Sequence, residues 1–291
     1  MKSTTTRNSL LLLLAAIIWG VAFVFQSVGA DHLGAFAFNA LRYPLGSLVL
    51  IPIILIKKKK NTLMTPAYKG AGIKGGIACG LCLFAASAFQ QLAMSDTSSG
   101  KAGFITAFYI VLVPVFGIFL KKKTSFAVWI AVVLAIIGLF CLCMKGSFSI
   151  APSDASLLAC AAIFACHILV IDHYSPMADG VVLSCVQFAT AAVLSFIFML
   201  VLEGIPAAAD IQAAGIALLY TGIMSCGVAY TLQIIGQNNM NPAAASIILS
   251  LESCVSVIAG MIMLGQMLDT WEIVGCIFMF VAVLITQLRR D

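Results

Sequence analysis

The sequence predicts an all-α polytopic membrane protein with ten transmembrane helices, and its composition, the length of its apolar segments and an internal similarity support this class. Hydrophobic residues make up 62% of the 291 residues and charged residues 9%, with a mean hydropathy of +1.11. A chain of this composition cannot cover itself with a polar surface. We therefore expect a protein embedded in lipid rather than a soluble enzyme.

Ten apolar segments have about the length, roughly 20 residues, that a helix needs to cross the hydrocarbon core. They are residues 9–28, 35–56, 75–93, 97–119, 125–144, 155–171, 181–202, 213–235, 242–264 and 271–288. Barrel strands would alternate apolar and polar residues, whereas the run from Ile130 to Cys143 is apolar throughout. The longest connection, 57–74, is too short for a folded soluble module, so any ligand site must be formed by the helices.

The positions of Lys and Arg predict that both termini are cytoplasmic. In that orientation thirteen of the sixteen basic residues fall on the cytoplasmic side, where positive charge is retained during insertion. They are Lys2, Arg7, Lys57, Lys58, Lys59, Lys60, Lys69, Lys74, Lys121, Lys122, Lys123, Arg289 and Arg290. These residues would lie beside anionic lipid headgroups, so the net charge of +5 requires no nucleic-acid partner. We expect a multi-pass protein of the inner or plasma membrane.

The motifs that could suggest a cofactor fail on their context. Most of the ten cysteines lie in apolar segments, as small buried hydrophobic residues do. Cys79 and Cys82 have metal-ligand spacing but no histidine close in sequence. Residues 70–75 fit G-x-G-x-x-G without the preceding strand that a nucleotide site needs. We therefore expect no metal, no cofactor and no catalytic residue.

The two halves of the chain resemble each other. Shifting residues 88–142 by 143 positions brings Gln90 onto Gln233 and Tyr109 onto Glu252, with apolar runs and connections in phase. An odd number of spans in each half would place the halves in opposite orientations, as in many secondary transporters. The predicted repeats are residues 1–146 and 152–291.

Four short motifs occur in this framework. They are Ile18-Trp19-Gly20, Leu41-Arg42-Tyr43, Gly103 to Tyr109 with Val113-Pro114, and Leu249 to Glu252. Through their order and spacing, nearly the whole chain resembles the ten-span EamA-type members of the drug/metabolite transporter superfamily. The resemblance implies two inverted five-helix repeats around a central cavity, with the fifth and tenth spans at the periphery.

The resemblance also implies a function, because members of this family mostly export small metabolites, amino acids or toxic amphiphiles by alternating access. The partners would be a small-molecule substrate and the lipid bilayer, and both a monomer and a homodimer are compatible with the sequence. Three alternatives remain open: a nucleotide-sugar or lipid-linked-sugar carrier of the same superfamily, an intramembrane lipid-acting enzyme, and a sensor. Substrate identity does not follow from the fold.

Three ionisable residues inside predicted spans are the strongest candidates for the site, because a charge inside a membrane costs about 2.5–3.5 kcal/mol. They are Arg42, Lys101 and Glu252. Arg42 and Glu252 would lie within about 6 Å of each other in depth. Glu252 is expected to bind a cationic substrate group or a proton, or else to pair with Arg42 or bond to a neighbouring helix. Arg42 would clamp a substrate carboxylate or act as a structural partner for loop carbonyls or for Glu252. Lys101 is expected to extend to the outer headgroups rather than to contact the substrate.

Aromatic and amide side chains near mid-depth complete the predicted site, since a cavity for a metabolite needs apolar walls with a few polar groups. Each of these side chains has packing between helices as its alternative role. The candidates are Trp19, Tyr109 and Tyr230 as walls, Gln90 and Gln233 as hydrogen-bonding groups, and His167 as a proton relay. Pro114, inside the segment 97–119, is expected to kink its helix.

Overall fold

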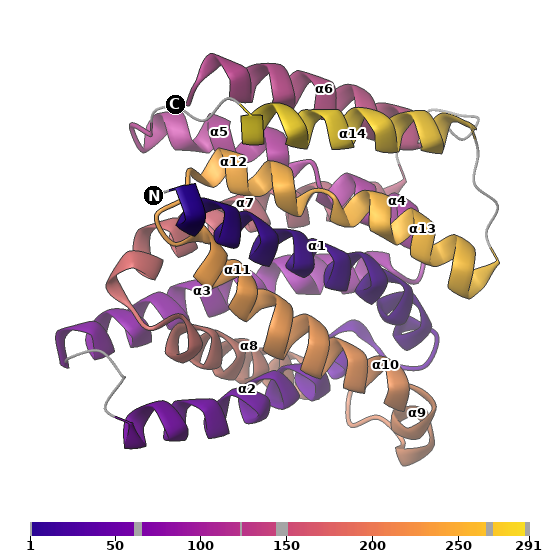
Figure 1. The fold of residues 1–291 in the computed structure, drawn as a ribbon. Helices are drawn as coiled ribbons and strands as arrows, with labels where there is room; N and C mark the ends of the chain where they lie inside the picture. Colours follow the sequence, from indigo (N-terminus) through magenta and orange to yellow (C-terminus); the bar gives the residue numbers. More distant parts are fainter. Residues whose placement is uncertain (1, 61–65, 123, 144–150, 266–269, 289–291) are drawn as a thin grey trace.

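A computed structural model describes residues 2–60, 66–122, 124–143, 151–265 and 270–288, and every regular element in these ranges is a helix (Figure 1). The predicted all-α class is therefore confirmed. The elements are α1 (Lys2–Ala30), α2 (Ala35–Lys59), α3 (Pro66–Ala93), α4 (Ser99–Thr106), α5 (Tyr109–Phe119), α6 (Phe126–Cys143), α7 (Pro152–Tyr174), the short η1 (Ser175–Met177), α8 (Gly180–Leu202), α9 (Ala208–Ala213), α10 (Gly215–Leu219), the π-helix η2 (Tyr220–Tyr230), α11 (Thr231–Gln237), α12 (Pro242–Leu249), α13 (Glu252–Leu264) and α14 (Thr270–Leu288).

Eight helical stretches are long and apolar enough to cross a membrane, which confirms a multi-pass membrane protein. They are Thr6–Ala30, Ala35–Lys59, Gly70–Ala93, Ser99–Phe119, Pro152–Met177, Gly180–Leu202, Gly215–Gln237 and Pro242–Leu264. The remaining two predicted spans, 125–144 and 271–288, correspond to shorter apolar helices at Phe126–Gly138 and Ile273–Ile285.

The helices pack as two rows of four spans. In the first row, neighbouring spans contact each other in the order α12–α13, α1, the continuous stretch α10–η2–α11, and α2. In the second row the order is α4–α5, α7, α3 and α8. The rows meet at both edges, where α2 packs along α8 and where α4 and α5 contact α13 and α12. Helices α6 and α14 pack chiefly on each other, at the top of Figure 1.

Small residues allow close packing within the rows, as is usual between membrane helices. A Cβ atom on Gly80 of α3 would lie 2.6 Å from Cβ of Thr190 and 2.7 Å from the carbonyl oxygen of Gln187, both on α8. In the first row, a Cβ atom on Gly20 of α1 would lie 2.8 Å from the carbonyl oxygen of Glu252. The missing side chains therefore set the distance between neighbouring helices.

Two spans are interrupted at positions that differ by 143 residues. Between α4 and α5 the amide of Phe108 donates to the carbonyl oxygen of Ile105 at 3.1 Å. Between α12 and α13 the amide of Leu251 donates to the carbonyl oxygen of Ile248 at 3.2 Å. These three-residue bonds are tightened, 3₁₀-type turns. The helix α5 continues through Pro114, and the interruption of this span lies one to two turns earlier, so the kink expected at Pro114 stays a prediction.

Basic residues gather at one end of the bundle, which we call the basic face and which lies on the left in Figure 1. It includes Lys57 to Lys60 at the end of α2, where cations favour a helix C-terminus, and Lys121 and Lys122 after α5. The other end, where α1 ends at Ala30 and α8 ends at Leu202, is called the opposite face.

Replacing Gly80 tests the close packing of α3 on α8. We expect Gly80→Ala to lower the free energy of unfolding by about 1–3 kcal/mol, because the new methyl group overlaps backbone that cannot move aside freely. Thermal unfolding of the purified protein in detergent measures the loss. Gly70→Ala on the same helix is the control, since nothing lies within 4 Å of its added Cβ. Equal effects of the two substitutions would contradict the packing role of Gly80.

Candidate functional site

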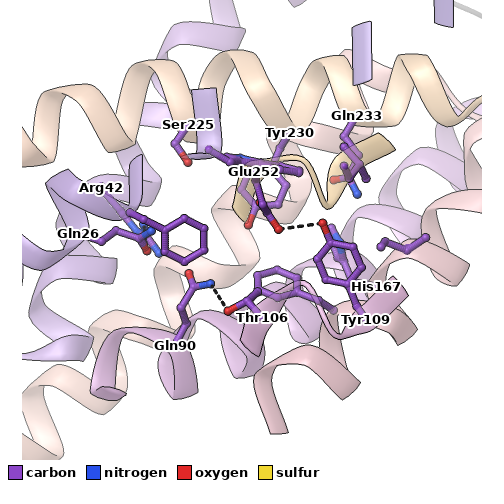
Figure 2. Close-up of a pocket in the computed structure, with 15 residues that line it drawn as sticks. Gln26, Arg42, Gln90, Thr106, Tyr109, His167, Ser225, Tyr230, Gln233 and Glu252 are labelled. Atoms are coloured by element: carbon purple, nitrogen blue, oxygen red, sulfur yellow. Dashed lines mark hydrogen bonds between the residues drawn. The ribbon is translucent and has the colours of Figure 1, made fainter. Parts of the chain in front are cut away.

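A buried cavity lies between the two rows (Figure 2). It is lined by Trp19, Phe23, Gln26, Arg42, Gln90, Thr106, Tyr109, Phe164, His167, Ile168, Ser225, Tyr230, Gln233, Leu249 and Glu252. All eight residues proposed from the sequence are among them. The volume of the cavity is about 40 Å³. The cavity is therefore narrow and surrounded by polar side chains.

Arg42 carries the positive charge of the cavity and is only 4% exposed. Its Nη1 donates to Oε1 of Gln26 at 3.0 Å, and its Nη2 donates to the hydroxyl of Tyr43 at 3.4 Å. The guanidinium also lies 5.3 Å from the ring centre of Phe38 and 5.1 Å from that of Tyr43. Aromatic faces attract a cation but do not neutralise it. Arg42 is thus held in place by neutral groups.

Glu252 carries the negative charge and is the first residue of α13. Its Oε1 accepts a 2.8 Å hydrogen bond from the hydroxyl of Tyr109, the first residue of α5. The bond crosses from the second row to the first and joins the two interrupted spans (Figure 2). A carboxylate is also favoured at a helix N-terminus, where the backbone amides point toward it. Glu252 is therefore anchored without a cation.

The expected alternative of an ion pair between Arg42 and Glu252 is wrong. The ion pairs found among the described residues are Lys57–Asp179, Lys101–Asp154 and Lys122–Asp172. The reason is the order of the first row, because α1 and η2 separate α2 from α13. Similar depth in the membrane does not bring two side chains together when their helices are not neighbours.

Lys101 forms an ion pair that the sequence did not predict. Its ammonium lies 2.7 Å from Oδ1 of Asp154, in the first turn of α7, and its extension to the outer headgroups stays a prediction. Asp154 Oδ2 in turn accepts a bond from the amide of Ala151. Lys101 lies outside the cavity lining and serves to join α4 to α7.

An amide and an imidazole side chain at the cavity form hydrogen bonds within the second row. Gln90 donates to Oγ1 of Thr106 at 3.3 Å, which links α3 to α4 (Figure 2). Nε2 of His167 lies 3.1 Å from Oε1 of Gln187 on α8, so Nε2 is the donor in this arrangement. These bonds fix the orientation of both groups in the second row.

Several buried polar atoms at the cavity have no hydrogen-bond partner within the described part of the chain. They are Nε of Arg42, Nε1 of Trp19, Nδ1 of His167 and Oε1 of Gln233. Trp19 instead packs edge-on against Tyr230, with ring centres 4.6 Å apart. A buried polar atom without a partner costs about 1–3 kcal/mol. Water or a bound solute must therefore supply hydrogen bonds in this cavity.

Seven lining residues were missed from the sequence: Phe23, Gln26, Thr106, Phe164, Ile168, Ser225 and Leu249. The most important is Gln26, the partner of Arg42. Trp19, Phe23 and Gln26 follow helical spacing of four and seven residues, so they share one face of α1. That spacing, counted from Trp19, could have identified Gln26.

A multi-pass helical membrane protein with a polar cavity between its spans has the architecture of a transporter. The chain matches the EamA-like transporter family over residues 7–144 and 152–288, and it belongs to that family. It is therefore a membrane transporter of the drug/metabolite transporter superfamily.

Individual proteins resemble the chain over most of its length. An uncharacterized transporter of Archaeoglobus fulgidus is 29% identical over 285 residues, covering 96% of this chain and 85% of that protein. The uncharacterized transporter YoaV of Bacillus subtilis is 22% identical over 266 residues, covering 90% of each. A crystal structure of a protein with 18% identity superposes with a TM-score of 0.75 over 97% of this chain and 96% of that one, which shows a shared fold.

Removing the Tyr109 hydroxyl tests its bond to Glu252. We expect Tyr109→Phe to lower the free energy of unfolding by about 1–3 kcal/mol, because it leaves a buried carboxyl group without this donor. Tyr220→Phe is the control, since the Tyr220 hydroxyl donates only to the backbone carbonyl of Ile18 at 3.2 Å. Thermal unfolding in detergent compares the two variants. A loss no larger for Tyr109→Phe than for Tyr220→Phe would contradict the role of the bond.

Proposed function

We propose that this transporter exports a small zwitterionic solute of the amino-acid class, with Arg42 binding its carboxylate and Glu252 its ammonium group. One observation carries the proposal: a buried cation and a buried carboxylate line the same cavity and do not pair with each other. A zwitterion would supply both missing counter-charges at once.

Arg42 favours a carboxylate ligand because its guanidinium is oriented but not neutralised. Gln26, Phe38 and Tyr43 occupy its sides, while its Nε has no partner among the described residues. A guanidinium presents paired N–H groups that match the two oxygens of a carboxylate. Trp19 adds a second free donor at the cavity.

Glu252 supports recognition of the ammonium group for the complementary reason. Among the described residues, only the Tyr109 hydroxyl donates a hydrogen bond to Glu252 Oε1. A neutral hydroxyl does not neutralise the negative charge of the carboxylate. An ammonium ion and a proton would compete for this carboxylate. That competition offers a way to couple export of the solute to entry of protons, with His167 as a second group at the cavity able to exchange a proton.

The size and charge of the cavity favour a small solute over the alternatives. With a cavity volume of about 40 Å³, even an amino acid requires the cavity to widen, and a nucleotide sugar requires far more. Arg42 is the only Lys or Arg among the lining residues, and Glu252 would repel a phosphate. An amphiphilic drug would leave at least one of the two charges without a partner.

Alternating access is supported by the arrangement of the rows. The tightened turns at Phe108 and Leu251, and the two residues Tyr109 and Glu252 that follow them, are related by the same shift of 143 positions. We take these as two inverted five-helix repeats that rock around the cavity. With the basic face toward the cytoplasm, both termini are cytoplasmic, and the protein resides in the inner or plasma membrane.

Transport is tested with inside-out vesicles that contain the purified protein. A pooled mixture of amino acids, their amides and their deaminated acids is supplied with and without a proton gradient, and accumulation is read by mass spectrometry. We expect gradient-dependent accumulation of one or a few amino acids and not of the corresponding amides or acids. Accumulation of none of these compounds, with the protein correctly inserted, would contradict the proposal.

Substituting each charge should remove one half of the selectivity. We expect Arg42→Gln to lose the roughly 10- to 100-fold preference for an amino acid over its amide, while the preference over the deaminated acid persists. Glu252→Gln should do the reverse and should also abolish the effect of the proton gradient. Lys101→Gln is the control, because this charge lies outside the cavity. Loss of both preferences in either variant, at normal protein level, would contradict the assignment of Arg42 to the carboxylate and Glu252 to the ammonium group of the solute.

A further inference from the structure

Side-chain contacts join the two rows at each face of the bundle, above and below the cavity. At the basic face Lys57, in the last turn of α2, forms an ion pair with Asp179, the residue that caps α8. Deeper on the same side, Nε2 of Gln237 on α11 donates to the carbonyl oxygen of Ile168 on α7 at 3.2 Å. Each contact links the first row to the second. We call them the basic-face contacts.

The opposite face has a matching set. The carboxylate of Glu203, directly after α8, accepts bonds from the backbone amides of Phe36 at 3.0 Å and Ala37 at 2.7 Å, at the start of α2. Nε2 of Gln91 on α3 donates to the carbonyl oxygen of Gln26 on α1 at 3.0 Å. These opposite-face contacts also link the second row to the first.

The charged side chains of the two sets occupy related positions in the two halves of the chain. Lys57 and Glu203 are 146 residues apart (203 − 57). The same pair of helices, α2 and α8, is thus joined near both ends, and each end uses a charged side chain from the C-terminal end of one helix on the N-terminal end of the other.

The chemistry of each contact suits formation and release. Asp179 keeps a partner without Lys57, because its Oδ1 accepts a bond from the amide of Val181 at 3.0 Å. Gly34, the residue before α2, has no side chain to cap this helix, and the Glu203 carboxylate occupies the cap position instead. A Cβ atom on Gly34 would lie 2.4 Å from the Glu203 carboxyl carbon. Carboxylates at the start of a helix are stabilised by its exposed amides.

The two other ion pairs among the described residues do not cross between the rows. Lys101 with Asp154, and Lys122 with Asp172 at 2.5 Å, join the span α4–α5 to α7, which both belong to the second row. Lys122 and Asp172 lie at the basic face, as Lys57 and Asp179 do. The molecule therefore contains, at one face, an ion pair between the rows and an ion pair within a row.

We propose that the basic-face contacts and the opposite-face contacts are the two gates of the transport cycle, each of which must release for the cavity to open to its own side. The proposal rests on the alternating access proposed above. Because Lys57 and Glu203 act at different faces, losing one contact should open one face and leave the other closed.

Hydrogen–deuterium exchange of the full-length protein in lipid nanodiscs tests the gates without any solute. The measured segments carry the second contact of each face, which the substitutions do not touch: the end of α11 with residues 165–171 at the basic face, and the end of α3 with residues 23–29 at the opposite face. We expect Lys57→Gln to raise exchange about tenfold in the basic-face segments only. Glu203→Ala should do so in the opposite-face segments only.

Two variants complete the test. Lys122→Gln removes the ion pair within the second row at the basic face and should leave exchange at both faces unchanged, and Lys57→Arg, which keeps the cation, should behave as the unsubstituted protein. Faster exchange at both faces in Lys57→Gln, or an equal effect of Lys122→Gln, would overturn the proposal. The exchange measurements do not depend on transport. If one face opens in each variant but no amino acid is taken up, the proposal of two gates is supported and the proposed substrate is rejected.

Discussion

In an apolar bundle a buried carboxyl group must obtain its hydrogen bonds from neighbouring helices, and at Glu252 the donor is Tyr109. This bond lies where the two interrupted spans meet, at one edge between the rows. The packing of α2 along α8 closes the other edge. The space left between these edges is where polar side chains collect. The cavity thus depends on contacts that hold the rows together while keeping their central helices apart.

A repeated scaffold here produces a cavity that is chemically unsymmetrical. By the shift of 146 positions Trp19 corresponds to Ala165 and Arg42 to Phe188, and all but Trp19 are buried. Phe188 carries no charge and packs on Tyr43 and Tyr230, with ring centres 6.2 and 5.8 Å apart. The single cation and the single carboxylate of the cavity consequently come from different halves, which gives the site a direction along which a zwitterion can align.

Backbone geometry also departs from the repeat near the cavity. Residues 220–230 form the π-helix η2, which contributes Ser225 and Tyr230 to the lining. The related residues 77–87 lie within the regular helix α3. A π-helix is wider than an α-helix, is rare, and is frequently found at functional sites. Here it lies between α1 and α2, so the wider turn presents Tyr230 to Trp19 at the centre of the first row.

The sequence by itself determined the class and the family, and it predicted ten apolar segments, of which eight are long enough to span a membrane and two are shorter helices. These segments can be recognised because hydrophobic length and composition are local properties of the chain. It also selected eight residues that share one cavity, since an isolated polar or ionisable group at mid-depth is costly wherever its helix packs, and a cavity for a solute also needs aromatic walls. Only the tertiary structure decided the partners. Arg42 contacts Gln26 rather than Glu252, and Lys101 contacts Asp154, because the order of helices in each row depends on side-chain packing between distant segments and leaves no periodic trace in the chain.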